Sequence, residues 1–511
     1  TYCRRSLHDR YFFADPLRIL DGVIAAPSFN LKNPLMVAKH VRSAVVSILL
    51  LKSRQDGEVS ERIRLVLKHL FPHFIRDYLL DTENHFRNAP ISTQALKTLL
   101  AEMPELPGEL VELFANNWAP EAAELATEDT ISGIIAGMST ELTVVLTRLH
   151  NRLTWARNTR KELHRKKDDG IIERDEEQLL WRCDDYIKGI VKRDAATYTL
   201  SVLGVEGFFP GYGVNDGGVI ASARRGFAKS VGKRAFDLNR GNVVALREFV
   251  PGNRLYANNG SFYVSRYHLG TDESTHLRTL YVNAEKRYVA EKNADTSYGQ
   301  TGSEEIDTLP LTDSDLTLSS RITDEEMLRF SMPVSILGRL RRTNKGGKGI
   351  KIGDREVSYL RGQGIELVNL GEAGRVGRGD IGHLICAVCG ATKSPYAVDA
   401  EINHFLKTHT ESCGKEPNRL ALTVKAGVDC LHFHKLEDEA VAINIGESLI
   451  AGAVRVLDMG TSDLESLVIH RPDETVDLLI FDPMPGGSGL LDQMLERWDE
   501  IIRATKELLH E

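Results

Sequence analysis

Cys386-Ala-Val-Cys389-Gly390 and, further along, His409-Thr-Glu-Ser-Cys413-Gly414 together form the pattern C-x2-C-x19-H-x3-C. Two thiolates on a tight turn, with a histidine and a cysteine one helical turn apart, supply the four soft ligands that tetrahedral Zn²⁺ prefers. The second pair is expected on a helix that begins near Ala400, because positions i and i+4 share one face of a helix. Such a site contributes on the order of 10 kcal/mol to folding, so it decides whether this part of the chain folds.

Four protein ligands leave no open coordination position, which indicates a structural rather than a catalytic metal. His404 competes for the histidine position because it lies five residues before His409. The same pattern could also arise from two unrelated buried thiols and histidines on the surface, without any metal. The remaining cysteines, Cys3, Cys183 and Cys430, have no partner at ligand spacing and are interpreted as small buried hydrophobic residues.

The sequence beyond the cysteines alternates between strand and helix. A strand is predicted at 420–424, a helix at about 438–457 and a buried strand at 476–481. A glycine-rich turn, Asp482-Pro-Met-Pro-Gly-Gly-Ser-Gly489, then leads into a final helix. Residues 371–511 are therefore expected to form an α/β zinc-binding domain.

The turn at 482–489 has three explanations at this point. A glycine-rich turn between a strand and a helix leaves backbone N–H groups at a helix N-terminus, where a phosphate can bind. The same glycines suit a purely structural turn, and Asp482 or Ser488 could act in catalysis. The spacing fits neither a Walker A loop, because no Gly-Lys-Ser/Thr follows, nor the nucleophile elbow of hydrolases.

Residues 1–195 are predicted to form a helical bundle. Asn33 is placed to cap a helix and Pro34 to begin it. A long amphipathic helix with a basic C-terminal end is expected over 130–167, and another helix over about 173–194.

Residues 196–370 are predicted to form a mostly β domain. Two polar interruptions, 293–315 and 339–353, are expected to be mobile loops. Short runs with β character alternate with glycine turns at 243–250, 255–256, 262–267, 277–282, 356–360 and 365–370. The fold class is therefore a multidomain α+β chain with an N-terminal helical bundle, a central β domain and a C-terminal α/β domain.

Composition excludes several classes of protein. The chain has 511 residues, of which 42% are hydrophobic and 27% charged, so a wholly disordered protein is excluded. Its net charge of -8 gives no general argument for nucleic-acid binding. The longest apolar run, around Ala44–Leu51, is far shorter than the roughly 20 residues of a bilayer span, so no membrane partner is expected. Six cysteines without a signal peptide favour a cytoplasmic location.

Three basic segments can pair with phosphates without reading a base sequence. They are Arg224–Arg234, Arg339–Lys351 and the helix end at 152–167. Each also fits a solvated loop or helix face, but three of them on an acidic chain favour at least one contact with DNA. The residues selected for this contact are Arg339, Arg341, Arg342, Lys345, Lys348, Arg165 and Lys166.

Motifs of an ATPase motor are missing from the sequence. Gly374-Arg-Val-Gly-Arg378 resembles the arginine-finger motif of superfamily 2 helicases, but Gly371 stands where that motif has glutamine. A flexible segment that leads into the cysteine turn explains these residues better. No Walker A sequence and no Asp-Glu-x-His occurs, so no catalytic residue is assigned in these 511 residues.

Several motifs together resemble the MZB domain, which is the zinc-binding C-terminal module of MrfA-type helicases. The motifs are the strand and turn at 478–490, Cys386-x2-Cys-Gly390 and Val368-Asn-Leu-Gly371. The usual description of the family's site has four cysteines, whereas this chain needs His409 as one ligand. The resemblance implies a structural Zn²⁺ in this domain.

Two other parts of the chain are similar to segments of the same helicases. Phe208-Phe-Pro-Gly-Tyr-Gly, Arg247-Glu-Phe-Val-Pro-Gly-Asn253 and Gly260-Ser-Phe-Tyr263 resemble the β region that precedes the MZB domain. The opening, Asp9–Leu20 and then Asn30-Leu-Lys-Asn-Pro34, is similar to the segment after the arginine finger. The same architecture occurs in large helicases of bacterial anti-phage systems such as Druantia and DISARM.

This resemblance implies that the chain is the C-terminal accessory region of a 3′–5′ ATP-dependent DNA helicase in genome maintenance or anti-phage defence. Thr1 begins what looks like the end of a core strand, which favours a motor upstream in the same chain. ATP and Mg²⁺ would then act only in that motor, and the partners would be DNA, the motor lobes and other defence subunits. The alternative is a stand-alone zinc-containing subunit that binds a separate helicase. A third hypothesis, a nuclease or hydrolase built around Asp482, has no metal-binding carboxylate cluster in the sequence.

Overall fold

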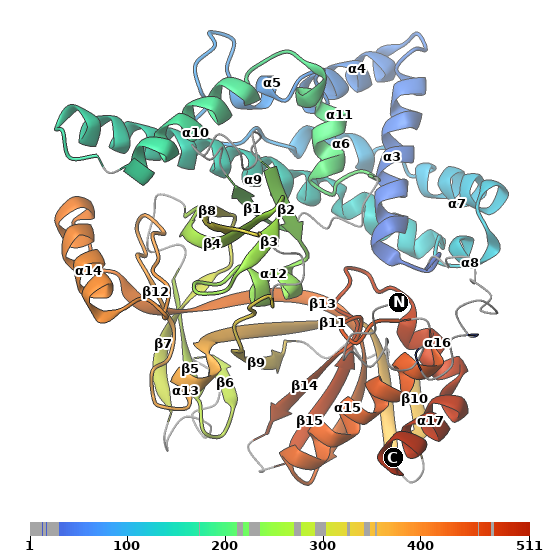
Figure 1. Ribbon diagram of the computed structural model, residues 1–511. Coiled ribbons are helices and arrows are strands. Elements are labelled where there is room, and N and C mark those ends of the chain that lie inside the picture. Colours follow the sequence, from blue (N-terminus) through green and yellow to red (C-terminus); the bar gives the residue numbers. More distant parts are fainter. Residues whose placement is uncertain are drawn as a thin grey trace.

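The structure is a computed structural model with mixed α+β architecture (Figure 1). It begins with helices and continues into a β-rich region with further helices near the C-terminus. The residues that it describes are 13, 17 and 30–510, except 173, 212–217, 224–235, 270–276, 292–302, 324–327, 342–347, 353–354, 458 and 472–474.

The first part of the described chain, to about residue 209, is a helical bundle at the top of Figure 1. Its helices pack around one hydrophobic cluster that extends from Val37 to Phe209, so the bundle continues past residue 195. The elements are α3 (Pro34–Lys52), α4 (Glu58–Leu70), α5 (Arg76–Leu79), α6 (Gln94–Ala101), α7 (Leu106–Asn117), α8 (Pro120–Ala123), α9 (Glu128–Asp168), α10 (Arg174–Ile190), η1 (Ala195–Thr197) and α11 (Thr199–Val205).

Two helix predictions in the bundle are confirmed. Asn33 caps α3, because its Oδ1 accepts hydrogen bonds from the backbone N–H groups of Leu35 and Met36, and Pro34 is the first helical residue. The 41-residue helix α9 covers the expected amphipathic stretch and buries its apolar face along most of its length.

Helices α3 and α9 each contain an 18-residue window that is apolar enough to cross a membrane by length and composition alone. Both helices bury residues such as Val41, Leu49, Leu142 and Leu149 in the core of the bundle. The buried share of the window is 33% in α3 and 39% in α9, so helix packing accounts for part of its apolar character.

A five-stranded sheet follows the bundle, in the order β2-β1-β8-β4-β3. Strands β1 and β8 run parallel, and the other neighbours run antiparallel. The strands are β1 (Val219–Ala223), β2 (Phe236–Arg240), β3 (Leu255–Ala257), β4 (Gly260–Tyr267) and β8 (Ser314–Arg321), with helix α12 (Asn242–Glu248) between β2 and β3.

A second sheet of ten strands is built on two long antiparallel strands, β11 (Arg355–Glu372) and β13 (Asn418–Leu436). The outer edge of β11 pairs with β10 and β9, and the outer edge of β13 pairs with β15, β7 and β12 in turn. The shorter strands are β5 (Arg278–Asn283), β6 (Tyr288–Glu291), β7 (Glu304–Pro310), β9 (Val334–Leu340), β10 (Lys348–Ile352), β12 (His383–Ile385), β14 (Glu465–His470) and β15 (Val476–Phe481).

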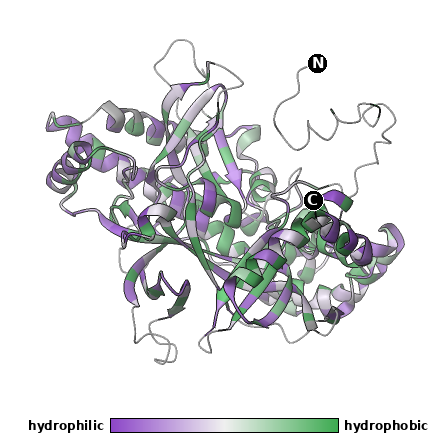
Figure 2. Cartoon of the chain, turned by 60° about the horizontal axis from the view of Figure 1, so that its bottom comes forward, coloured by the Kyte–Doolittle hydropathy of each residue, from purple (hydrophilic) through white to green (hydrophobic). Residues whose placement is uncertain are grey.

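The β11–β13 pair joins the central and C-terminal regions into one unit. One hydrophobic cluster lies between the two sheets, and another lies between the β13–β15 end of the large sheet and the C-terminal helices. Figure 2 shows hydrophobic residues concentrated on these central strands and hydrophilic residues on the outer helix faces. The remaining helices are α13 (Ala373–Val376), α14 (Asp399–Cys413), α15 (Glu439–Val456), α16 (Leu490–Glu496) and α17 (Trp498–His510).

Four sequence predictions need correction. Residues 243–250, predicted as a strand, contain helix α12, whose buried Val243 and Leu246 have helical spacing; packing overrides the β preference of the two valines. The predicted loop at 293–315 contains β7 and the start of β8, and that at 339–353 contains the end of β9 and β10. The final helix is two helices, which break at Arg497.

The predicted boundary at residue 370 also differs from the structure. Residue 370 lies inside β11, and the predicted strand at 420–424 is the first part of the much longer β13. Periodicity could not show this, because the length of these two strands depends on their pairing with each other, over more than 50 positions in the sequence.

Candidate metal centre

The cysteine turn begins directly after β12. The backbone N–H of Gly390 donates to the carbonyl oxygen of Cys386 over 2.9 Å, and the N–H of Cys386 donates to Ala391 over 2.9 Å. These bonds close a tight turn that presents Cys386 and Cys389 on one side. Gly390 has φ 74°, which L side chains rarely adopt.

The same glycine fixes the turn to the five-stranded sheet. The backbone N–H of Tyr267 in β4 donates to the carbonyl oxygen of Gly390 over 2.8 Å. A Cβ atom at Gly390 would lie 2.0 Å from the carbonyl oxygen of Tyr267, so no other residue fits without moving the strand. The glycine that follows the second cysteine is therefore required by contact as well as by backbone conformation.

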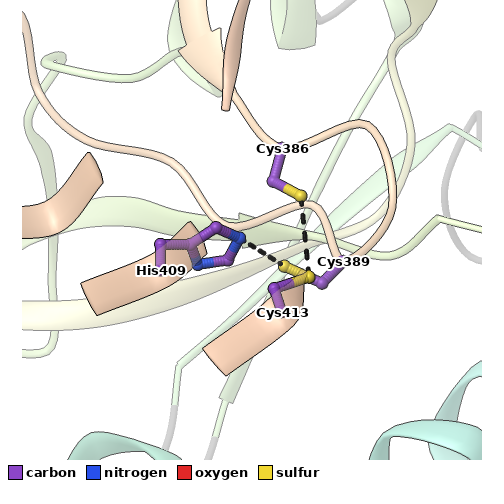
Figure 3. A group of neighbouring side chains, drawn as sticks. All are labelled: Cys386, Cys389, His409 and Cys413. Carbon is purple, nitrogen blue, oxygen red and sulfur yellow. Dashed lines mark hydrogen bonds between the residues drawn. The ribbon is translucent and has the colours of Figure 1, made fainter. Parts of the chain in front are cut away.

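Helix α14 supplies the other two candidate ligands. His409 and Cys413 lie one turn apart on its last two turns, and Gly414 ends the helix in the left-handed conformation. All four predicted residues, Cys386, Cys389, His409 and Cys413, point toward one another (Figure 3). Their ligand atoms lie within 4.8 Å of one another.

The distances within this cluster fit a tetrahedral Zn²⁺. A Zn–S length of about 2.3 Å and a Zn–N length of about 2.05 Å require tetrahedral edges of roughly 3.8 Å for S···S and roughly 3.6 Å for S···N. The Sγ atoms of Cys386 and Cys413 are 3.9 Å apart, and Sγ of Cys389 is 3.5 Å from Nε2 of His409. The cluster therefore has the size of a metal site, and its donor set is consistent with zinc.

The electrostatic surroundings favour a thiolate at Cys389. Contacts with Cys386 and Cys413 hold the pKa of Cys389 well below the usual range, and the guanidinium of Arg266 acts in the same direction. Nη1 of Arg266 donates to the carbonyl oxygen of Cys389 over 3.3 Å. Three thiolates and a neutral imidazole around Zn²⁺ carry a net single negative charge, which Arg266 is placed to compensate.

His404, the competing ligand, lies outside the cluster. It is exposed on α14, whereas His409 is half-buried and faces the cysteines. Burial alone would lower the pKa of His409, but contacts with Cys386 and Cys389 raise it to about 9 in the metal-free protein. The geometry therefore selects His409 over His404.

The predicted nucleic-acid residues do not gather at one place. Lys166 is buried, and its Nζ lies 2.6 Å from Oε1 of Glu176, so it joins α9 to α10. Arg339 binds Glu366, which is fully buried, and Glu291. Arg165 and Arg341 are exposed.

The side chains of the other residues predicted to contact DNA are not described by the structure. Arg342 and Lys345 lie outside the described residues, as does most of the basic segment 224–234. Lys348 begins strand β10. Of the seven residues selected from the sequence, the structure therefore describes two as exposed cations, Arg165 and Arg341.

The glycine-rich turn at 482–489 is closed by its own aspartate. Oδ2 of Asp482 accepts hydrogen bonds from the N–H and the hydroxyl of Ser488, over 2.6 and 2.5 Å, and Oδ1 accepts one from the N–H of Met484. These are the N–H groups that a phosphate would otherwise take, and the carboxylate beside Ser488 is itself occupied by the hydrogen bonds that close the turn. The contacts favour the structural explanation of the turn over the phosphate-binding and catalytic ones.

The turn also contacts the segment before α3, far away in the sequence. Nδ2 of Asn33 donates to the carbonyl oxygens of Pro485 and Gly487 over 3.1 and 3.0 Å, and Nδ2 of Asn30 donates to Gly487 over 2.9 Å. The residue that caps α3 with its oxygen thus holds the C-terminal turn with its nitrogen. We call this contact of Asn30 and Asn33 with residues 485–487 the terminal clasp.

A second group of possible metal ligands is not predicted by the sequence patterns. His432 and His434 lie on β13, and Asp477 lies on the neighbouring strand β15. The available signal was a His-x-His pair within one strand, where positions i and i+2 face the same side. The aspartate could not be found, because only strand pairing brings it near.

No protein-family model matches the chain, and no curated protein matches it. Two crystal structures of the DUF1998 helicase MrfA are similar to it. The MrfA structure bound to DNA has 9% sequence identity and a TM-score of 0.24, over 65% of this chain and 35% of that chain. The structure bound to DNA and AMPPNP has 10% identity and a TM-score of 0.18, over 57% and 28%.

The similarity to MrfA is loose. TM-scores this low do not establish a common fold, and the chain spans about a third of the length of these helicases. The function is therefore argued from residues and their contacts.

Proposed function

We propose that this chain is the C-terminal accessory region of an ATP-dependent superfamily 2 DNA helicase that acts in genome maintenance or anti-phage defence. In this proposal the helical bundle guides DNA, and the metal centre holds the β-rich region in shape. ATP hydrolysis occurs in a motor outside these 511 residues. The protein would act in the cytoplasm, with the motor lobes and other defence subunits as partners.

The observation that carries the proposal is that the motifs that resemble MrfA-type helicases contact one another. Asn369, from the Val-Asn-Leu-Gly motif, is fully buried, and its Nδ2 donates to the carbonyl oxygen of Leu246, just before the Arg247–Asn253 motif. Its Oδ1 accepts from the N–H of Gly371 and lies 3.0 Å from Nε2 of His383, three residues before the first ligand cysteine.

The other shared motifs are joined in the same way. The terminal clasp links Asn30-Leu-Lys-Asn33 to the Gly-Gly-Ser-Gly turn. Gly390 of the cysteine turn contacts Tyr267, which lies on β4 four residues beyond the Gly260–Tyr263 motif. Residues whose identity is required by mutual contact are those expected to be shared by proteins with the same assembly. These contacts support the resemblance in sequence motifs, and the proposed DNA-related role rests on that resemblance.

A DNA-guiding role needs exposed cations on a rigid element. Lys161 and Arg165 lie one turn apart on α9 and are both exposed, with His164 beside them. Cations at this spacing line one face of a helix and can contact adjacent phosphates without reading bases. We assign the DNA contact of the bundle to this face and to the exposed Arg341 at the end of β9.

The test is DNA binding by the 511-residue chain, measured by fluorescence anisotropy with labelled single-stranded and forked DNA at several salt concentrations. The variant Lys161→Glu/Arg165→Glu is expected to bind roughly tenfold more weakly. Its plot of log affinity against log salt should be shallower by roughly 1.4, the value for two phosphate contacts on a single strand.

Arg64→Glu/Lys68→Glu on α4 is the matched control, because it reverses two exposed cations at the same helical spacing. Equal binding by the two variants would refute the assigned surface.

The intact mass of the natural polypeptide distinguishes a motor in the same chain from a stand-alone subunit. A larger mass with extra N-terminal sequence supports a motor in the same chain, and a mass near 56.9 kDa supports the stand-alone subunit.

A further inference from the structure

A group of three side chains lies at the far end of β13, away from the cysteine cluster. His432 and Asp477 are each 2% exposed, and His434 is exposed. One ligand atom from each residue lies within 4.8 Å of the other two. Neither the proposed helicase role nor the cysteine centre uses these residues.

Strand pairing explains why they meet. His432 is opposite Leu479 in β15, so Asp477, two residues before Leu479, faces the same side of the sheet. A register shift after Phe433 then brings the backbone N–H of Lys435 to Oδ1 of Asp477, over 3.0 Å. The bulge therefore fixes the carboxylate beside the two imidazoles.

The ring nitrogens of the buried His432 lack hydrogen bonds among the described residues. Nε2 of His432 lies 3.1 Å from Oδ2 of Asp477. Even so, neither ring nitrogen of His432 has a partner in hydrogen-bond geometry among the described residues. A buried ring nitrogen without a hydrogen bond destabilises the folded state, and coordination of a cation at Nε2 would remove that penalty.

The arrangement has the size and donor set of a transition-metal site. Nitrogen and oxygen ligands at about 2.0–2.2 Å require a separation of roughly 2.9 Å in octahedral and roughly 3.4 Å in tetrahedral geometry. The observed 3.1 Å lies between them. Two imidazoles and one carboxylate suit Zn²⁺, Fe²⁺ or Co²⁺ rather than Mg²⁺ or Ca²⁺, which prefer oxygen ligands alone.

The groups around these ligands orient them, as outer-shell partners do at metal sites. Nη1 of Arg471 lies 2.9 Å from Oδ2 of Asp477, and the hydroxyl of Ser358 is 2.9 Å from Nε2 of His434. A carboxylate oxygen has a second lone pair, so Oδ2 can bind a metal while it accepts from Arg471. The positive charge of Arg471 makes this a weaker site than the cysteine centre.

We propose that His432, His434 and Asp477 form a second, three-ligand site for a divalent transition-metal ion. Three protein ligands leave at least one coordination position for water, unlike the closed set of four at the cysteine centre. The exposed side of His434 gives the ion a path from solvent. This proposal is independent of the helicase role.

The test uses the full chain with zinc retained at the cysteine centre, titrated with Co²⁺ and followed by calorimetry and visible absorption. The wild type is expected to bind one equivalent of Co²⁺ whose spectrum has d–d bands and no thiolate charge-transfer band. Entry of Co²⁺ at the cysteines would add that band, so the two sites are distinguished.

His434→Gln, at an exposed position, is expected to lower Co²⁺ affinity roughly tenfold or more. His404→Gln is the matched control, since His404 is an exposed histidine far from the group, and it should bind as the wild type does. Asp477→Asn should weaken binding as well, with circular dichroism to check folding. Absence of the additional equivalent in the wild type, or undiminished binding by His434→Gln, would overturn the proposal.

Discussion

Asn33 and Gly487 are 454 positions apart in the sequence and are joined by a buried hydrogen bond of 3.0 Å from Nδ2 to the carbonyl oxygen. The same asparagine caps α3 with its Oδ1. One side chain therefore sets the start of the helical bundle and the position of the C-terminal turn. This makes the terminal clasp a point at which the two halves of the chain are expected to unfold together.

Asn33→Ala removes the helix cap and the two hydrogen bonds to the turn. A cap is worth about 1 kcal/mol and each neutral hydrogen bond about 1 kcal/mol, so a loss of about 2–3 kcal/mol in the free energy of unfolding is expected. Urea unfolding measures the change. A separate, early unfolding transition of the helical bundle should also appear if the clasp couples the bundle to the C-terminal region.

Gly487→Ala tests the other side of the clasp. Gly487 has φ 81°, and a Cβ atom there would lie 2.6 Å from Oδ2 of Asp429. Gly170→Ala is the matched control, because Gly170 has φ 72° but nothing within 4 Å of its Cβ position. We expect Gly170→Ala to cost about 1–2 kcal/mol from backbone strain alone, and Gly487→Ala to cost about 1–3 kcal/mol more from the clash. Equal thermal stabilities would mean that the turn and Asp429 move apart at little cost.

The choice of histidine at the cysteine centre can be tested by metal content. His409→Ala should lose most of the bound zinc and expose the segment around α14 to protease, because a three-cysteine site lacks its fourth ligand. His404→Ala should keep one equivalent of zinc. Elemental analysis of both purified proteins decides the matter, and zinc loss in the His404 variant instead would reverse the assignment.

The stability of the protein should fall in mild acid because of His383. Burial lowers the pKa of His383 to about 3 in the folded protein, while the unfolded chain has the ordinary value near 6.5. Below pH 6.5 the unfolded state binds a proton that the folded state does not bind. The free energy of unfolding should therefore decrease by up to about 1.4 kcal/mol per pH unit as pH falls from 6.5 toward 3.

His383→Gln removes this titration and retains a side-chain N–H for Oδ1 of Asn369. Urea unfolding at pH 7.5, 6.5 and 5.5 should give a shallower pH dependence for the variant than for the wild type. Loss of metal in acid affects both proteins and cancels in the comparison. Identical slopes would show that His383 does not resist protonation in the folded state.

Arg339 and Arg341 are two residues apart at the end of β9 and should behave differently. Arg339→Gln removes one of the two arginines that bind the buried carboxylate of Glu366, the other being Arg278. A loss of about 3 kcal/mol or more is expected when a buried ion pair is broken. Arg341→Gln should leave thermal stability within about 0.5 kcal/mol of the wild type and lower DNA affinity. A stable Arg339→Gln protein with weakened DNA binding would restore Arg339 as a surface contact.

The cysteine cluster was predictable because its signal is local. Two short pairs of residues at fixed spacing specify a turn and one helical turn, and only their meeting depends on the rest of the fold. Asn33 and Pro34 as the start of α3, and the buried strand at 476–481, were predictable for the same reason. In each case the neighbours that define the feature lie within a few positions of one another.

The basic residues show where local patterns fail. Lys166 and Arg339 were selected because they lie in cationic stretches, yet both form ion pairs with glutamates that are not part of those stretches. Charge in a sequence window says nothing about distant counter-ions. Arg165 and Arg341 lie in the same two basic stretches as Lys166 and Arg339, and they are exposed.

The sequence by itself determined the helical character of the first part of the chain, the spacing of the metal ligands and the start of helix α3 at Asn33-Pro34. Only the tertiary structure decided that β11 and β13 pair along most of their length, that residues 243–248 are helical, that the turn at 482–489 holds Asn33, and that His432, His434 and Asp477 meet. The physical reason is that periodicity and spacing record interactions between near neighbours. Strand pairing, buried ion pairs and the terminal clasp instead join groups whose separation in the sequence carries no information about their contact.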